Sequence, residues 1–72
     1  LQIEDDQIKI HFSKDENRQI AIYDISGRLH YREDFFSKKE LIIPSASFSR
    51  GIYLLKLYSK DNNQVNIHKF IL

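Results

Sequence analysis

The sequence contains no cysteine, methionine or tryptophan, and it has one proline and two glycines among its 72 residues. Without cysteine the chain forms neither a disulfide nor a thiolate metal site. Its apolar runs fall far short of the roughly 20 residues that a membrane-spanning helix needs. The two glycines stand apart, outside any phosphate-binding pattern. A chain with these absences depends on a hydrophobic core for its stability.

The sequence also lacks an excess of charge of either sign. The 11 basic and 10 acidic residues are interspersed, and the formal net charge is +1. A nucleic-acid-binding domain normally gathers its basic residues on one face. We therefore expect no nucleic-acid partner.

Length and composition predict one domain, residues 1–72. Hydrophobic residues make up 42% of the chain, which is enough for a core. A chain this short still buries only about 60% of its unfolded surface, so most apolar residues must reach that core. The acidic opening, Leu1–Asp6, has neither the charged region nor the apolar region of a signal peptide. We interpret the chain as an excised piece of a longer secreted protein.

The longest apolar run is Ser49–Tyr58, and the rest of the chain is organised around it. Its β-branched and aromatic residues favour a strand. Because both of its faces are largely apolar, the run predicts a strand inside a sheet that is covered on both sides. One face carries Ile52, Leu54, Lys56 and Tyr58, and the other carries Tyr53, Leu55 and Leu57.

Residues 18–36 predict a β-hairpin. Ile20 and Ile22 share one face of its first strand. Asp24 and Gly27 supply turn chemistry, because an aspartate side chain bonds nearby amides and glycine adopts positive φ without steric cost. In the second strand, which begins at Arg28, alternation puts three residues on one face: Leu29, Tyr31 and Phe35.

The remaining segments predict further short strands at 7–12, 40–43 and 65–72. Pro44 stops the second of these, since proline cannot donate to a ladder. The connection 45–50 is built of small residues, with Phe48 as its apolar anchor. About six or seven short antiparallel strands with turns between them indicate an all-β fold, a small immunoglobulin-like or Greek-key β-sandwich.

Candidate catalytic and metal-binding patterns do not emerge. The three histidines, His11, His30 and His68, fall on three different predicted strands, without the spacing of zinc ligands. Glu4–Asp6 lacks the regular oxygen spacing and turn glycine of a calcium loop. No serine lies in a nucleophile-elbow context. We expect no cofactor, no metal and no enzymatic activity.

Three segments, in order, resemble one known family. Ile20–Arg28 resembles the I-Y-D-x-x-G-R/K segment of type A C-terminal sorting domains, the cargo signals of the type IX (Por) secretion system of Bacteroidetes. Ile43–Lys56 is similar to that family's L-x-x-L-x-x-G-I-Y-L-v-K segment, with Phe48 where leucine is usual. The ending His68–Leu72 is similar to its terminal strand of two lysines and two hydrophobic residues.

This resemblance implies a transport role and no catalysis. The folded domain would be recognised in the periplasm and would carry an N-terminal passenger across the outer membrane to the cell surface or the medium. Its implied partners are the type IX translocon and a surface sortase, which attaches anionic lipopolysaccharide to the passenger. In family members that keep the domain, it would instead serve as a docking module on the cell surface.

Two groups of residues are candidates for recognition or for structure. A terminal strand at a sheet edge can pair with a partner strand, so both roles stay open for Lys69, Phe70, Ile71 and Leu72. Gly51 and Tyr53 are recognition candidates that we expect to serve mainly the fold, as are the turn residues Asp24, Gly27 and Arg28. The two-faced central strand also admits a homodimer.

Two other functions compete with sorting. An adhesive or carbohydrate-binding β-sandwich would expose coplanar aromatic residues, for which Tyr31, Phe35, Phe36 and Tyr58 are the candidates. Their alternation with apolar neighbours favours core positions instead. A structural spacer domain would have no reason to end in a segment that is similar to a terminal signal.

Overall fold

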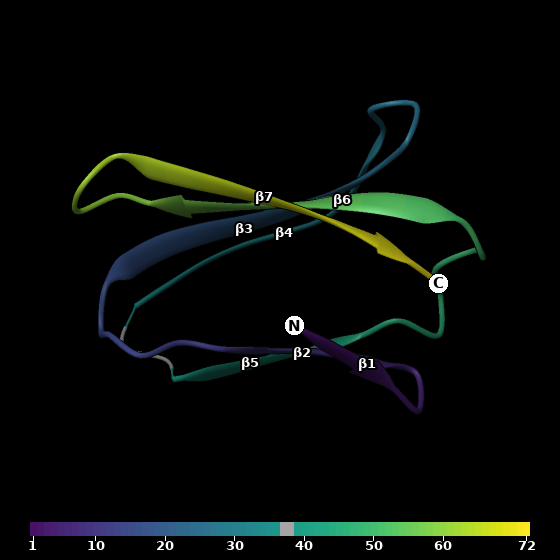
Figure 1. The fold of residues 1–72 in the computed structure, drawn as a ribbon, viewed down its shortest axis with the longest axis horizontal. Helices are drawn as coiled ribbons and strands as arrows, with labels where there is room; N and C mark the ends of the chain where they lie inside the picture. The colour runs from purple at the N-terminus through teal and green to yellow at the C-terminus, as the bar shows by residue number, and fades with distance from the viewer. Residues whose placement is uncertain (37–38) are drawn as a thin grey trace.

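The computed structural model describes residues 1–36 and 39–72, and these contain seven β-strands. The strands form two antiparallel sheets that lie face to face (Figure 1). One sheet has the order β1-β2-β5 and the other the order β4-β3-β6-β7. The all-β sandwich predicted from the sequence is confirmed. The strands are β1 (Gln2–Glu4), β2 (Gln7–His11), β3 (Asn17–Asp24), β4 (Leu29–Phe36), β5 (Glu40–Pro44), β6 (Ile52–Ser59) and β7 (Gln64–Ile71).

Alternate residues from both sheets build the core. Successive side chains of a strand point to opposite faces, so a period of two sends one set inward. Each fully buried side chain of this kind stabilises the fold by about 1.5–3 kcal/mol. The buried cluster consists of Ile8, Ile10, Leu41 and Ile43 from the three-stranded sheet and Ile20, Ile22, Phe35, Tyr53, Leu55 and Phe70 from the four-stranded sheet.

The central strand β6 lies inside its sheet, between β3 and β7, but only one of its faces is covered. Tyr53 and Leu55 are buried, whereas Ile52 and Lys56 on the other face are exposed. The predicted cover on both sides is therefore wrong. Seven short strands suffice for two layers, and each sheet of a two-layer sandwich keeps an outer face.

The hairpin of β3 and β4 contains a register shift that the sequence reading missed. Ile22 pairs with Tyr31, but the next residue, Tyr23, pairs with Leu29. His30 is the extra residue of this bulge. Leu29 therefore leaves the face that Tyr31 and Phe35 share and becomes exposed, so its predicted place is wrong.

The acidic opening of the chain forms a strand that was not predicted. β1 pairs with β2 through a two-residue turn in which both residues have positive φ, Asp5 at 45° and Asp6 at 62°. A turn of this type matches the twist of the two strands, and aspartate tolerates the left-handed region. Lys9 adds a cross-strand ion pair, with its Nζ 3.0 Å from Oε1 of Glu4.

Candidate recognition surface

Asp24 organises the turn between β3 and β4. Its Oδ1 accepts hydrogen bonds from the backbone N–H groups of Ser26 and Arg28, both at 3.0 Å, and from the Ser26 hydroxyl at 2.5 Å. Its Oδ2 lies 2.9 Å from Nε2 of His30. Gly27 completes the turn with φ at 91°, a conformation that strains other residues. Asp24, Gly27 and Arg28 are thus placed in one local turn.

These hydrogen bonds, that of the Ser26 hydroxyl first and that of His30 next, lower the pKa of Asp24 well below its ordinary value of 3.8. A depressed pKa in the folded state means that the carboxylate stabilises the fold above its unfolded pKa and loses that effect as the pH falls. We expect Asp24→Ala to be less stable than the wild type at neutral pH. The difference between the two should narrow from about pH 4 downward, because the unfolded chain takes up a proton at the ordinary pKa of aspartate while the folded carboxylate still resists protonation.

Urea midpoints of both proteins, measured from about pH 6 to about pH 2, test this expectation. Glu4→Ala is a matched control, because the carboxylate that it removes pairs with the cation of Lys9 and accepts no hydrogen bond from the β3–β4 turn. A gap between wild type and Asp24→Ala that stays constant to the lowest pH would show that the ionised carboxylate adds nothing to the turn.

Tyr53 lies at the centre of an aromatic cluster, and only 3% of its surface is exposed. Its ring centroid is 5.4 Å from His30, 5.5 Å from Phe48 and 5.7 Å from Phe70. Its hydroxyl donates a hydrogen bond of 2.6 Å to the carbonyl oxygen of Ser49. Tyr53 therefore connects β4, the 45–50 connection and both C-terminal strands.

Gly51 joins the start of β6 to the end of the chain. Its N–H donates to the Leu72 carbonyl at 3.1 Å, and the Leu72 N–H donates to the Gly51 carbonyl at 2.9 Å. This pair extends the β6–β7 ladder by one step beyond Ile52 and Ile71.

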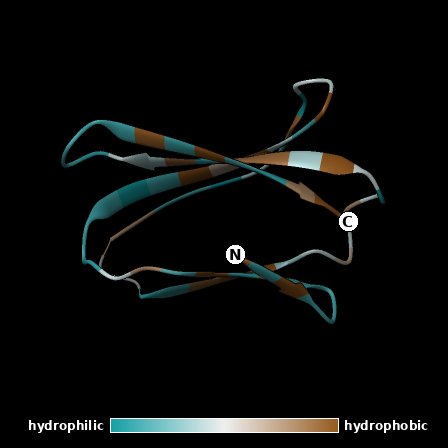
Figure 2. Ribbon diagram, in the orientation of Figure 1, coloured by the Kyte–Doolittle hydropathy of each residue, from teal (hydrophilic) through white to brown (hydrophobic). Residues whose placement is uncertain are grey.

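The last four residues divide between the two faces of the sheet. Phe70 points into the core with 5% of its surface exposed, and Leu72 packs against the same core at its rim. Lys69 and Ile71 lie on the outer face, where Ile71 is 67% exposed. β7, coloured by hydropathy in Figure 2, alternates between hydrophilic and hydrophobic residues in its first half only. His68 and Lys69 are both hydrophilic, and Phe70 and Ile71 are both hydrophobic. A partner approaching the outer face therefore meets Lys69 and Ile71 before the other two.

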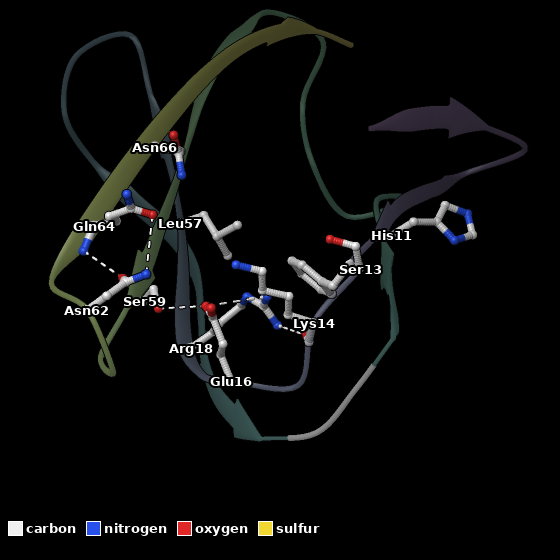
Figure 3. A pocket seen from close by; sticks show the side chains of 11 residues that line it. His11, Ser13, Lys14, Glu16, Arg18, Leu57, Ser59, Asn62, Gln64 and Asn66 are labelled. Carbon is white, nitrogen blue, oxygen red and sulfur yellow. Dashed lines mark hydrogen bonds and ion pairs between the residues drawn. The ribbon is translucent and has the colours of Figure 1, made fainter.

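A polar pocket of about 260 Å³ opens between the β2–β3 connection and the β6–β7 hairpin (Figure 3). Arg18 lies at its base with 7% of its surface exposed. The Arg18 Nη1 donates to the Lys14 carbonyl at 3.0 Å, and Nη2 lies 3.5 Å from Oε2 of Glu16. The Ser59 hydroxyl donates to the same Glu16 oxygen at 2.7 Å, and the guanidinium lies 4.3 Å from the centre of the Phe12 ring.

This Arg18 cluster was missed in the sequence. The signal was present, because Arg18 occupies the same phase of β3 as the buried Ile20 and Ile22. An arginine in an inward phase of a strand indicates a buried, paired charge. In the structure its donors are taken up by Glu16 and a backbone carbonyl, so the cluster closes one end of the sandwich.

The aromatic residues considered for sugar stacking do not gather on one surface. Phe35 belongs to the core, and Tyr31 packs partly against it. Phe36 is exposed at the end of β4, while the Tyr58 hydroxyl donates to Oδ1 of Asn63 in the β6–β7 turn. This dispersal offers no flat aromatic platform.

The parts of the chain that the structure describes hold no group of three or more histidine, cysteine, aspartate or glutamate side chains placed to bind a metal ion. No helix long and apolar enough to cross a membrane occurs among the same residues.

The fold and these clusters define a small antiparallel β-sandwich domain, with an exposed C-terminal strand at the edge of its larger sheet. Residues 4–72 match the family described as the secretion system C-terminal sorting domain. Because the match spans nearly the whole chain, the chain belongs to this family of type IX secretion signals. The family is one of secretion sorting signals and is not known as enzymatic, and a signal of this kind implies export to the cell surface or the extracellular space. Neither the curated proteins nor the solved structures gave a match.

Proposed function

We propose that residues 1–72 act as one sorting module that carries an N-terminal passenger from the periplasm across the outer membrane. The family match over residues 4–72 is the observation that carries this proposal. The partners are the type IX translocon, which takes up the module, and the sortase, which releases the passenger and joins it to anionic lipopolysaccharide. The passenger is then attached to the surface or released.

Lys69 and Ile71 are the residues that we assign to translocon contact. Both are exposed on the outer face of the edge strand β7. Structural contacts account for four of the other candidates, Gly51, Tyr53, Phe70 and Leu72. Tyr53 and Phe70 are buried against each other, and Gly51 exchanges two backbone hydrogen bonds with Leu72.

A passenger fusion tests the proposal. Residues 1–72 follow an export signal and a fluorescent reporter in a Bacteroidetes host, with and without a working type IX system. We expect reporter on the surface only in the competent host. Reporter held in the periplasm of both hosts would refute the sorting function.

Point variants then locate the recognition surface. Lys69→Glu and Ile71→Asp should reduce surface delivery by about tenfold, a loss that corresponds to about 1.4 kcal/mol of binding. Arg32→Glu on β4, an exposed charge reversal on the opposite edge of the same sheet, should have no effect. Deleting residues 70–72 is a poorer test, because it also removes the buried Phe70.

Each variant must melt within a few degrees of the wild type, so that a loss of delivery reports recognition and not unfolding. Suppose that a reporter without the domain is not delivered, but that Lys69→Glu and Ile71→Asp are delivered normally. Recognition would then lie elsewhere on the domain than at these two residues.

A further inference from the structure

The backbone of β7 has a free edge whose donors and acceptors can be identified. Gly51 and Leu72 exchange both of their backbone hydrogen bonds, and the β6–β7 register runs without a shift from there to Ser59 and Gln64. In an antiparallel ladder, bonded and non-bonded pairs alternate. The N–H and C=O groups that point away from β6, toward the open edge, are therefore those of Val65, Ile67, Lys69 and Ile71.

Sheet edges are usually protected by charged side chains such as lysine, by proline, by bulges, by short strands or by inward-pointing charges. Of these features the edge of β7 carries a lysine, Lys69. β7 is eight residues long, contains no proline and pairs with β6 in continuous register. Ile67 and Ile71, two of the four residues with outward backbone groups, have 63% and 67% of their surface exposed. The edge is thus open and flanked by apolar side chains.

The charged side chains of the two strands at this edge are of one sign. None of the 10 acidic residues of the chain falls in β6 or β7, which carry Lys56, His68 and Lys69. Lys56 pairs with Ile67, so Lys69, two residues further along, is its diagonal neighbour on the outer face. Diagonal neighbours in a sheet lie about 7–8 Å apart. Neither lysine forms an ion pair with a residue in the described ranges.

A second copy of the chain is a poor occupant for the same reason. Pairing β7 with its own copy brings a second set of cations to the edge and no strand carboxylate. Bringing like charges together at an interface is unfavourable, whereas a partner with the opposite charge binds more favourably.

We propose that the open edge of β7 accepts an extended strand of a partner protein, whose outer-face side chains are apolar except for a carboxylate beside Lys69. This deepens the proposed sorting function, on which it rests for its setting. The partner strand would bond to the backbone of Val65, Ile67, Lys69 and Ile71, in the way that strand addition supplies affinity through the main chain and specificity through alternate side chains.

The test uses residues 1–72 and a labelled nine-residue peptide of alternating valine and threonine with one central glutamate. Fluorescence anisotropy measures its binding, and a second peptide has lysine in place of glutamate. We expect the glutamate peptide to bind about tenfold more tightly than the lysine peptide, as one favourable charge contact allows. Lys69→Glu should reverse this preference, whereas Arg32→Glu should leave it unchanged.

Ile67→Pro separates backbone pairing from charge attraction. The Ile67 N–H points outward, so proline there removes no hydrogen bond within the domain, and proline is tolerated at such edge positions. We expect the variant to keep its fold by circular dichroism and to lose peptide binding. Ile67→Thr, which keeps the N–H, should retain most of it.

Several outcomes would overturn the inference. One is equal affinity for the two peptides, and another is peptide binding that survives Ile67→Pro. A concentration-dependent dimer that Ile67→Pro abolishes would make a second copy the occupant. Binding to phosphatidylglycerol vesicles that responds to Lys69→Glu but not to Ile67→Pro would make it a lipid surface.

The passenger fusion distinguishes this inference from the sorting function itself. If the wild-type domain delivers the reporter and Ile67→Pro delivers it equally well, sorting stands and strand addition is refuted. If the wild-type domain delivers nothing, the sorting function is refuted, and the peptide measurements alone decide the chemistry of the edge.

Discussion

Replacing Tyr53 with alanine is expected to destabilise the domain by about 3–5 kcal/mol, as is usual when a buried aromatic side chain is removed. A chain of this length holds about 4–11 kcal/mol of stability in total. Tyr53 packs against His30, Phe48 and Phe70, which come from three different parts of the chain. The loss therefore falls on contacts that no neighbouring residue can replace, and it removes a large share of the total stability.

Urea denaturation followed by circular dichroism measures this loss. Tyr53→Phe keeps the ring and removes the hydrogen bond to the Ser49 carbonyl, so it should cost only about 1 kcal/mol. Tyr58→Ala, on the outer face of the same strand, is the control for strand propensity. A Tyr53→Ala protein as stable as Tyr58→Ala would contradict the central place of this ring. A stable Tyr53→Phe that is no longer exported would assign the hydroxyl to recognition.

The core could be predicted because it follows from a local pattern. Ile20 and Ile22 in β3 and Ile8 and Ile10 in β2 alternate with polar or small residues, and a strand has only one way to bury such a set. The turn after β3 was also predictable. Asp24 supplies a hydrogen-bond acceptor, and Gly27, three residues later, adopts the positive φ that the turn requires.

Other features depend on neighbours that a single strand does not reveal. Alternation in β6 assigns residues to two faces, but whether a further layer covers the second face is decided by the number of strands in the fold. The bulge at His30 depends on space beside Phe48 and Tyr53, which come from elsewhere in the chain. β1 is three residues long with exposed side chains, so it carries no hydrophobic periodicity to detect.

The candidate site was predictable in part for the same reason. Alternation in the sequence puts Lys69 and Ile71 on one face and Phe70 and Leu72 on the other, but it does not say which face is buried. The register with β6 decides this, with Phe70 opposite the buried Tyr53 and Lys69 opposite Leu54. That pairing shows that Lys69 and Ile71 face outward while Phe70 completes the core.

Replacing Arg18 with methionine is expected to destabilise the domain by about 3 kcal/mol. Removing one partner of a buried ion pair costs about 3–5 kcal/mol, and we take the lower value because the Glu16 side chain keeps 17% exposure. Methionine fills much of the space over the Phe12 ring, so packing changes little. What remains is the carboxylate of Glu16, which then has the Ser59 hydroxyl but no cation beside it.

A double-mutant cycle tests whether this charge pairing is the cause. Glu16→Gln removes the negative charge and keeps an oxygen that can accept the Ser59 hydrogen bond, so Arg18→Met with Glu16→Gln should be more stable than Arg18→Met alone. Lys9→Met, whose ion pair with Glu4 is solvent-exposed, is the matched control and should cost far less stability than Arg18→Met. If the double variant is no more stable than Arg18→Met, the loss comes from the hydrogen bond to Lys14 and the contact with Phe12. Arg18 would then stabilise this end of the sandwich through the hydrogen bond and the ring contact, and the charge of Glu16 would make no contribution.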